Sequence, residues 1–404
     1  MENKRNRWWT TAVTILALAV YFAAMCWLHH QQLCATDGYA SDLSTHLEMA
    51  EKGFIYSTAS LLIVPAYAIA GTWGISVLVA LFQLAGLAVF AKGIQAAVPQ
   101  LSAPVRMLIS LVVNLAQAVW IPRGGYWYLG TINGTIYHNT TYIMLAPFAM
   151  LAMFAFYRVW AGMHTRLDAR AWLVLTVLLT LATSFKASFV FAFAPMLLIL
   201  LIVDLVKTRG NNLLREILMG CSVLPSIALC LIQSMVLFGK EGEGLQLIFM
   251  VDWSSIPGEQ ISWGLFNEAS RRGILRSLVF VAAVAVLLGR AAWKKFRYRV
   301  SFAAFAVAMA EALLIVEKGE RIGHANLWWG PFICYWIFFL ESFCALLQGW
   351  QSWQKGQRGA LLGSRLVVCT AALLWHIVSG ICFLVLLMQG NSYNIPIATW
   401  KFWF

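Results

Sequence analysis

The sequence is poor in charged residues. Only 11% of its 404 residues are Asp, Glu, Lys or Arg, and 61% are hydrophobic, whereas soluble domains are about a quarter charged and about half apolar. This composition excludes a soluble globular protein. Apolar runs of about 17–25 residues recur along the chain, each long enough to cross a hydrocarbon core as a helix. The short alternating segments typical of transmembrane β-barrels are lacking. We therefore predict an all-α polytopic membrane protein.

The cysteine spacing of a metal site or a disulfide framework is also missing. Seven of the eight cysteines lie in apolar runs, no CxxC pair occurs, and only Cys34 lies in a polar loop. We predict no cofactor and leave a divalent metal open. The first apolar run, Trp8 to Leu28, is too long for the apolar core of a signal peptide and lacks a small-residue cleavage pattern. It is interpreted as an uncleaved first span.

The distribution of the net charge of +12 predicts the topology. The segment Phe54 to Ala70 contains Pro65 and ends at a Gly71-Thr72-Trp73-Gly74 break, so we interpret it as an interfacial or re-entrant helix. With the amino terminus inside, the cytoplasmic loops then hold nineteen basic and four acidic residues, and the outer loops ten basic and eleven acidic ones. This bias follows the positive-inside rule and places the carboxyl terminus outside. The positive charge is thus a topogenic signal and indicates no nucleic-acid partner.

The topology predicts about eleven transmembrane helices in a single transmembrane domain covering residues 1–404. A first outer loop with interfacial helices covers residues 29–74, and a large outer loop covers 239–273. The predicted spans lie near residues 8–28, 75–91, 105–121, 142–160, 171–186, 189–206, 217–238, 274–290, 299–316, 327–347 and 366–389.

The first outer loop carries the candidate catalytic residues. Ser41 is expected to cap a short surface helix with Asp42 in its first turn, Leu43 on its apolar stripe and Gly53 at its end. Asp42 and His46 are four residues apart and share the polar face, where an ionised carboxylate is able to take a proton from an acceptor hydroxyl. The alternative is that Asp42 only stabilises the helix start and that His46 is solvated.

Two further outer segments carry candidate substrate-binding residues. Residues 121–141 are rich in aromatic and hydrogen-bonding groups and include His138 and Asn139 at the mouth of a span, a composition suited to a sugar but also to an ordinary interfacial aromatic belt. A metal site at His46 and His138 has no supporting ligand spacing. Lys186 interrupts an apolar region, where it either contacts a bound anion or lies in a tight outer turn.

The densest cluster of charged residues follows the predicted ninth span. If the helix continues outward, Glu317, Glu320, Arg321 and His324 share one face, and Arg321 with His324 is able to grip a phosphate while the glutamates orient them. The alternative is an ion-pair network within a loop.

These features together resemble the GT-C superfamily of integral membrane glycosyltransferases. The likeness rests on Asp37, Ser41-Asp42 and His46 in an interfacial helix after the first span, followed by a second interfacial segment with Pro65. The stretches Tyr137 to Thr141, Ser184 to Lys186 and Glu320 to Asn326 also look like motifs of bacterial membrane proteins of this type. The chain departs from the pattern at Leu43, where many of these enzymes carry a second acid.

The resemblance implies an inverting transfer of a sugar from a polyprenyl-phosphate-linked donor to an acceptor on the outer face of the cytoplasmic membrane, in synthesis of a cell-envelope glycan or lipid. Asp42 is then the base, with Asp37 as the second candidate, and Arg321, His324 and Lys186 hold the donor phosphate. The expected partners are the lipid-linked donor and membrane lipid, and the sequence leaves a protein partner unknown. The alternatives are an O-antigen polymerase or ligase and a lipid or oligosaccharide transporter, although the sequence shows no internal repeat.

Overall fold

The structure is a computed structural model of the chain. It describes residues 4–120, 126–127, 134–237, 245–247, 268–317, 326–356, 359–391 and 395–396. The described chain is almost entirely helical, and seven of its helices are long and apolar enough to cross a membrane. The protein is therefore a multi-pass helical membrane protein. The helices are α1 (Lys4–Cys34), α2 (Asp42–Glu51), α3 (Thr58–Ala97), α4 (Ala103–Val113), α5 (Thr140–Gly162), α6 (Ala169–Phe185), α7 (Ser188–Thr208), α8 (Leu213–Cys221), α9 (Leu224–Leu237), α10 (Glu268–Ala283), α11 (Arg290–Trp293), α12 (Phe296–Leu314), α13 (Trp329–Gln354) and α14 (Ala360–Met388).

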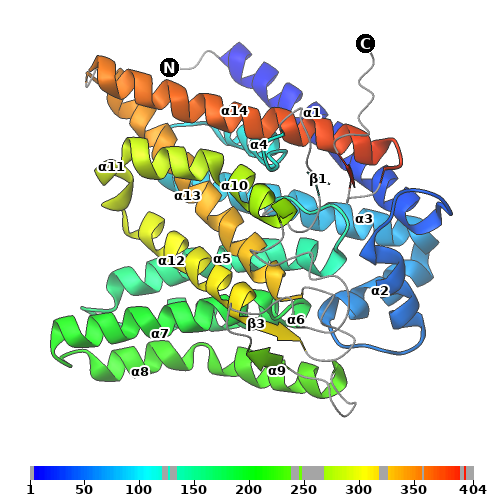
Figure 1. Cartoon of the computed structure of the whole chain (residues 1–404), viewed down its shortest axis with the longest axis horizontal. Helices are drawn as coiled ribbons and strands as arrows, with labels where there is room; N and C mark the ends of the chain where they lie inside the picture. Colours follow the sequence, from blue (N-terminus) through cyan, green and yellow to red (C-terminus); the bar gives the residue numbers. More distant parts are fainter. Residues whose placement is uncertain are drawn as a thin grey trace.

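A π-helical turn (Val284–Leu288), a 3-10 turn (Asn326–Trp328) and four very short strands are also described. Strand β1 (Tyr126–Trp127) pairs antiparallel with β4 (Ile395–Pro396), and β2 (Leu245–Leu247) pairs antiparallel with β3 (Ile315–Glu317). The long helices run across the view in Figure 1, with α2 toward one end of the bundle and α11 and the α7–α8 turn toward the other. The exterior of the bundle is apolar: Ile69 of α3 is 85% exposed and Val206 of α7 is 72% exposed. Exposed aliphatic side chains of this kind suit a protein that faces lipid.

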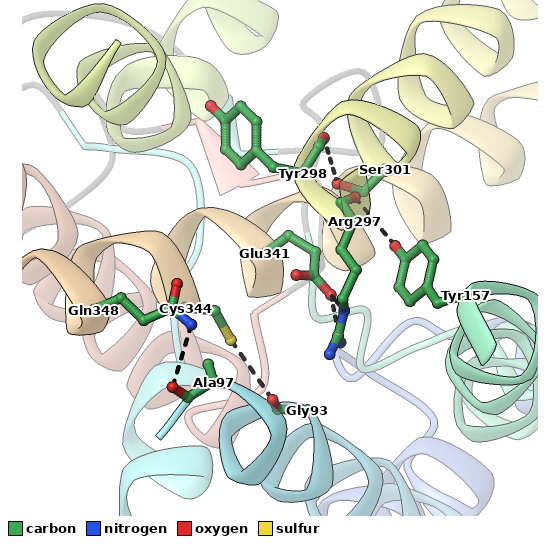
Figure 2. A network of polar contacts seen from close by, with 9 residues as sticks. All are labelled: Gly93, Ala97, Tyr157, Arg297, Tyr298, Ser301, Glu341, Cys344 and Gln348. Atoms are coloured by element: carbon green, nitrogen blue, oxygen red, sulfur yellow. Dashed lines mark hydrogen bonds and ion pairs between the residues drawn. The ribbon is translucent and has the colours of Figure 1, made fainter. Parts of the chain in front are cut away.

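Helix α13 is the core of the bundle. Every residue from Trp329 to Leu346 is buried, as expected for a helix that is apolar on all sides. Its one buried acid, Glu341, accepts hydrogen bonds from Arg297 of α12 through Nε (2.9 Å) and Nη2 (2.6 Å). Figure 2 shows this pair beside Tyr157 of α5, whose ring lies 4.9 Å from the guanidinium carbon. The charge of the buried Glu341 is therefore compensated by Arg297 inside the bundle, as a buried charge requires.

The break predicted after Ala70 is confirmed. Helix α3 loses helical backbone geometry at Ala70 and Gly71, and Gly71 has φ +58°. A Cβ on Gly74 would lie 2.0 Å from the carbonyl oxygen of Ala66, so the two glycines permit the bend and the close approach that follows. The segment with Pro65 is thus a helix of its own, separated from the long helix that ends at Ala97.

The third predicted span, 105–121, is only partly helical. Helix α4 ends at Val113, and residues 114–120 form an irregular segment packed against α10 and α14. The nitrogen of Gln117 donates to the carbonyl of His376 (3.1 Å), and His376 Nδ1 donates to the carbonyl of Gln117 (2.6 Å). The nitrogen of Trp120 donates to Ser379 Oγ (2.9 Å). Irregular backbone within a membrane protein is stable only where its polar groups are satisfied in this way, which a hydropathy pattern does not reveal.

Each of the other predicted spans corresponds to helical structure, but the count of eleven remains a prediction. Helix α10 begins at Glu268, inside the predicted outer loop 239–273, most of which lies outside the described residues. Helix α12 ends at Leu314, and Glu317 lies in strand β3. The helix does not continue outward from the ninth predicted span, because the chain becomes extended before the charged cluster begins.

Candidate functional site

The first outer loop folds locally as predicted. Ser41 Oγ accepts a hydrogen bond from the nitrogen of Leu43 (2.9 Å) and so caps α2, with Asp42 in the first helical turn. Gly53 follows the helix with φ +76°, a conformation that favours glycine. Leu43 and Ala50 are buried against the bundle. His46 is buried on the same side of α2 as these two residues, so the prediction that it shares a polar face with Asp42 is wrong.

Helix α2 is held against the start of α5. The nitrogen of Asp42 donates to the carbonyl of His138 (3.0 Å), and Ser41 Oγ donates to the same carbonyl (3.2 Å). Asn139 is the N-cap of α5, and its Oδ1 accepts from the nitrogen of Tyr142 (2.9 Å). The prediction that His138 and Asn139 stand at the mouth of a helix is confirmed.

A chain of three hydrogen bonds joins the ammonium of Lys186 to the carboxylate of Asp42. Lys186 Nζ donates to Thr141 Oγ1 (3.2 Å), Thr141 Oγ1 donates to Asn139 Oδ1 (2.9 Å), and Asn139 Nδ2 donates to Asp42 Oδ2 (2.5 Å). Every donor points from the ammonium toward the carboxylate. Hydrogen bonds aligned in this way polarise and strengthen one another, so the two charged groups are fixed relative to each other.

Lys186 reaches the site from the two-residue turn between α6 and α7. It is the C-cap of α6, and α7 begins at Ser188. Its ammonium lies 4.8 Å from the ring centroid of Trp329, within cation–π distance. The two interpretations of Lys186 are therefore not exclusive, because the residue lies in a tight turn and also directs its charge into the site.

Two imidazoles complete the site. His46 is 9% exposed, and its Nδ1 is hydrogen-bonded to the Tyr56 hydroxyl (3.0 Å). The pKa of His46 is lowered to about 4, mainly by burial and in part by Lys186, while Asp42 opposes the shift. Burial also lowers the pKa of His138 to about 4, with Asp42 opposing the shift and Lys186 adding to it. Both imidazoles are therefore neutral near pH 7, and His46 is not the solvated residue of the alternative interpretation.

Asp37, the second candidate base, does not join this site. Asp37 is exposed in the turn after α1, and Tyr39, two residues further on, bonds through its nitrogen to the carbonyl of Gly390 (3.1 Å) at the end of α14. The structure does not bring Asp37 to Asp42. Glu320, Arg321 and His324 lie outside the described residues. Their neighbour Glu317 is 7% exposed and accepts a hydrogen bond from the Asn326 amide (2.7 Å).

The sequence did not single out Trp329, Thr141, Tyr142 or Tyr56 as site residues. Trp329 lies against Tyr142, with ring centroids 5.5 Å apart, and against His138 at 6.0 Å. One signal for Trp329 was present in the Trp-Trp-Gly-Pro sequence at the start of α13. A Cβ on Gly330 would lie 3.1 Å from the carbonyl oxygen of Ser188, so this glycine lets α13 approach α7 beside the Lys186 turn.

Among the described residues, no group of three or more His, Cys, Asp or Glu side chains is arranged to hold a metal ion. In the described part of the site, the arrangement offers one carboxylate, one ammonium and neutral hydrogen-bonding groups. Comparisons of the chain with protein-family models, with curated proteins and with solved structures found no match in any of the three.

Proposed function

We propose that this protein is an integral membrane glycosyltransferase that moves a sugar from a polyprenyl-phosphate-linked donor to an acceptor at the outer face of the membrane. The observation that carries the proposal is the hydrogen-bonded chain from Lys186 to Asp42. It gathers a carboxylate and a cation from α2, α5 and the α6–α7 turn, although these residues are far apart in the sequence.

Asp42 is the base in the proposed reaction. Asn139 binds its Oδ2, and among the described residues its side chain has no other hydrogen-bond partner. Asp42 Oδ1 then takes the proton of the acceptor hydroxyl while the acceptor oxygen forms a bond to C1 of the sugar. The bond between C1 and the phosphate oxygen breaks, and its electron pair leaves with the polyprenyl phosphate. Attack opposite the leaving phosphate inverts the configuration at C1, and the phosphate needs little acid assistance.

Lys186 compensates the charge that develops on the departing phosphate. An ammonium held beside a neutral hydroxyl and an aromatic face is suited to this task, because preorganised positive charge stabilises a developing anion without reorganisation. Arg321 and His324 are proposed to complete the phosphate-binding site. His138 and Asn139 are buried, with 5% and 3% exposure, so in this arrangement they support Asp42 and Lys186 more directly than they contact the sugar.

The same proposal includes a GT-C arrangement, eleven spans and a site at the outer face of the cytoplasmic membrane. They are supported by the loop charges and by the interfacial features around Asp42 and Pro65. In Figure 1, α2 lies at the opposite end of the bundle from the α7–α8 turn, where the basic residues Lys207, in the last turn of α7, and Arg209, its C-cap, lie. This separation is what the predicted topology requires.

The proposal is tested with purified protein in nanodiscs and a panel of synthetic polyprenyl-phosphate monosaccharides. Release of free polyprenyl phosphate is measured by mass spectrometry, because it is produced whichever sugar is transferred. Membrane lipids and detergent extracts of cell envelope serve as acceptor pools. We expect protein-dependent release with at least one donor and none in empty nanodiscs. Equal release with and without protein across the whole panel would contradict the proposal.

A further inference from the structure

Asn139 has a fixed orientation that is set by its own helix. Its Oδ1 accepts from the nitrogen of Tyr142 (2.9 Å) and from the Thr141 hydroxyl (2.9 Å). The backbone N–H of Tyr142 requires an acceptor, so the amide cannot be rotated to exchange its oxygen and nitrogen. The Nδ2 group must therefore face α2, where it meets Asp42 Oδ2 at 2.5 Å.

Asn139 has little capacity left for a ligand. The residue is 3% exposed, and its oxygen already serves two donors. Its nitrogen holds one of the two oxygens of Asp42, and the neighbouring carbonyl of His138 holds the nitrogen of Asp42 and the hydroxyl of Ser41. Residues 138 and 139 thus help to dock α2 and set the rotation of the Asp42 carboxylate.

From this geometry we infer that Asn139 is a positioning residue, which aims the free oxygen of Asp42 at the acceptor and couples the capping of α5 to the docking of α2. The inference rests on the proposed function for its catalytic consequence. The docking itself does not depend on any substrate. Among the described residues, the charged and titratable groups that interact with Asp42 are His46 of α2 and His138 before α5, and Lys186 of the α6–α7 turn acts on both imidazoles.

Asn139→Asp is the informative variant, because aspartate also caps helices well. Its carboxylate keeps the acceptor that Tyr142 and Thr141 require but replaces the donor to Asp42 with a second carboxylate. Two carboxylates at this distance do not both ionise readily, and the pair shares a proton at lower pH. The double variant Asp42→Asn/Asn139→Asp reverses the pair, because the amide then at position 42 is able to donate to the carboxylate at position 139.

The first readout is the thermal unfolding midpoint in nanodiscs at pH 8 and pH 5, each compared with wild type at the same pH. We expect Asn139→Asp to unfold several degrees below wild type at pH 8 and to lose most of that difference at pH 5. We expect the double variant to recover the wild-type midpoint at both values. An Asn139→Asp protein that matches wild type at pH 8, or a double variant that recovers nothing, would overturn the inference.

The second readout is the rate of polyprenyl phosphate release. A misplacement of a catalytic group by about 1 Å typically costs about 10²-fold, so we expect Asn139→Asp to lose about that much at pH 8 and to regain part of it toward pH 5. The double variant is expected to stay inactive despite its restored stability, because its carboxylate lies on the wrong helix. An active double variant would contradict the positioning role, whereas a wild-type protein inactive with every donor would contradict the proposed function alone.

Discussion

The ammonium of Lys186 lies 4.8 Å from the centroid of the Trp329 ring. This contact joins the turn between α6 and α7 to the first residue of the central helix α13. Because Trp329 is 4% exposed, the aromatic face that holds the cation is part of the core and moves little. The positive charge of the candidate site therefore has a defined position relative to Asp42.

Replacement of Lys186 by Met should weaken binding of the lipid-linked donor. Hydrogen bonds to charged groups contribute about 1.5–3 kcal/mol, so we expect about a 10- to 100-fold loss of affinity for a polyprenyl phosphate in nanodiscs. Lys52→Met is the matched control, because Lys52 is exposed and pairs with Glu48. Equal affinity in wild type and Lys186→Met would remove Lys186 from the phosphate site.

Acidification should destabilise the protein through His46 and His138. Their pKa values are lowered to about 4 in the folded state from about 6.5 in an unfolded chain. The unfolded state therefore binds more protons, and stability that is complete above pH 6.5 falls as the pH drops toward 4. We expect the thermal midpoint to decline over this window and the decline to be shallower in His46→Gln. A flat profile in wild type would show that these imidazoles are not buried as described.

Gly380 of α14 is required by the irregular segment that follows α4. A Cβ at this position would lie 1.6 Å from the carbonyl oxygen of Leu115, so Gly380→Ala should destabilise the protein by about 1–3 kcal/mol through overpacking. Gly86→Ala is the control, because a Cβ there meets nothing within 4 Å, and alanine favours a helix interior. Thermal unfolding of the two variants should differ in sign. Equal stability of Gly380→Ala and wild type would contradict the packing of residues 114–120 on α14.

The orientation of the chain can be tested by cysteine labelling. In a Cys34→Ser background, an impermeant thiol reagent applied to intact cells should label Glu48→Cys and should not label Asn211→Cys until the membrane is opened. Both positions are exposed, so accessibility within the protein does not limit the reaction. The reverse pattern would invert the topology and place the candidate site on the cytoplasmic side.

Local sequence signals predicted the helix around Asp42 correctly. A capping serine, an acid in the first turn and a closing glycine act within a few residues, so Ser41, Asp42 and Gly53 suffice to place α2. The same holds for the break at Gly71, because the backbone geometry there is a property of glycine itself.

The assembly of the site could not be predicted from the sequence, because it depends on packing between segments that are distant along the chain. Asn139 meets Asp42 across 97 positions of sequence, and no local pattern specifies that contact. The unwinding after Val113 was missed for a related reason. Residues 105–121 are apolar enough for a span, and the groups that satisfy their irregular backbone, His376 and Ser379, come from α14.

The most direct test of the central claim is the turnover of Asp42→Asn beside wild type and Asp37→Asn, at matched donor occupancy in nanodiscs. Loss of a general base typically costs about 10²–10⁴-fold in rate, so we expect Asp42→Asn to lose at least about 10²-fold in polyprenyl phosphate release. Its donor affinity should stay near wild type, because the base acts on the acceptor, and the exposed Asp37 should tolerate the same change. Wild-type turnover in Asp42→Asn would show that this carboxylate is not the base and would contradict the account.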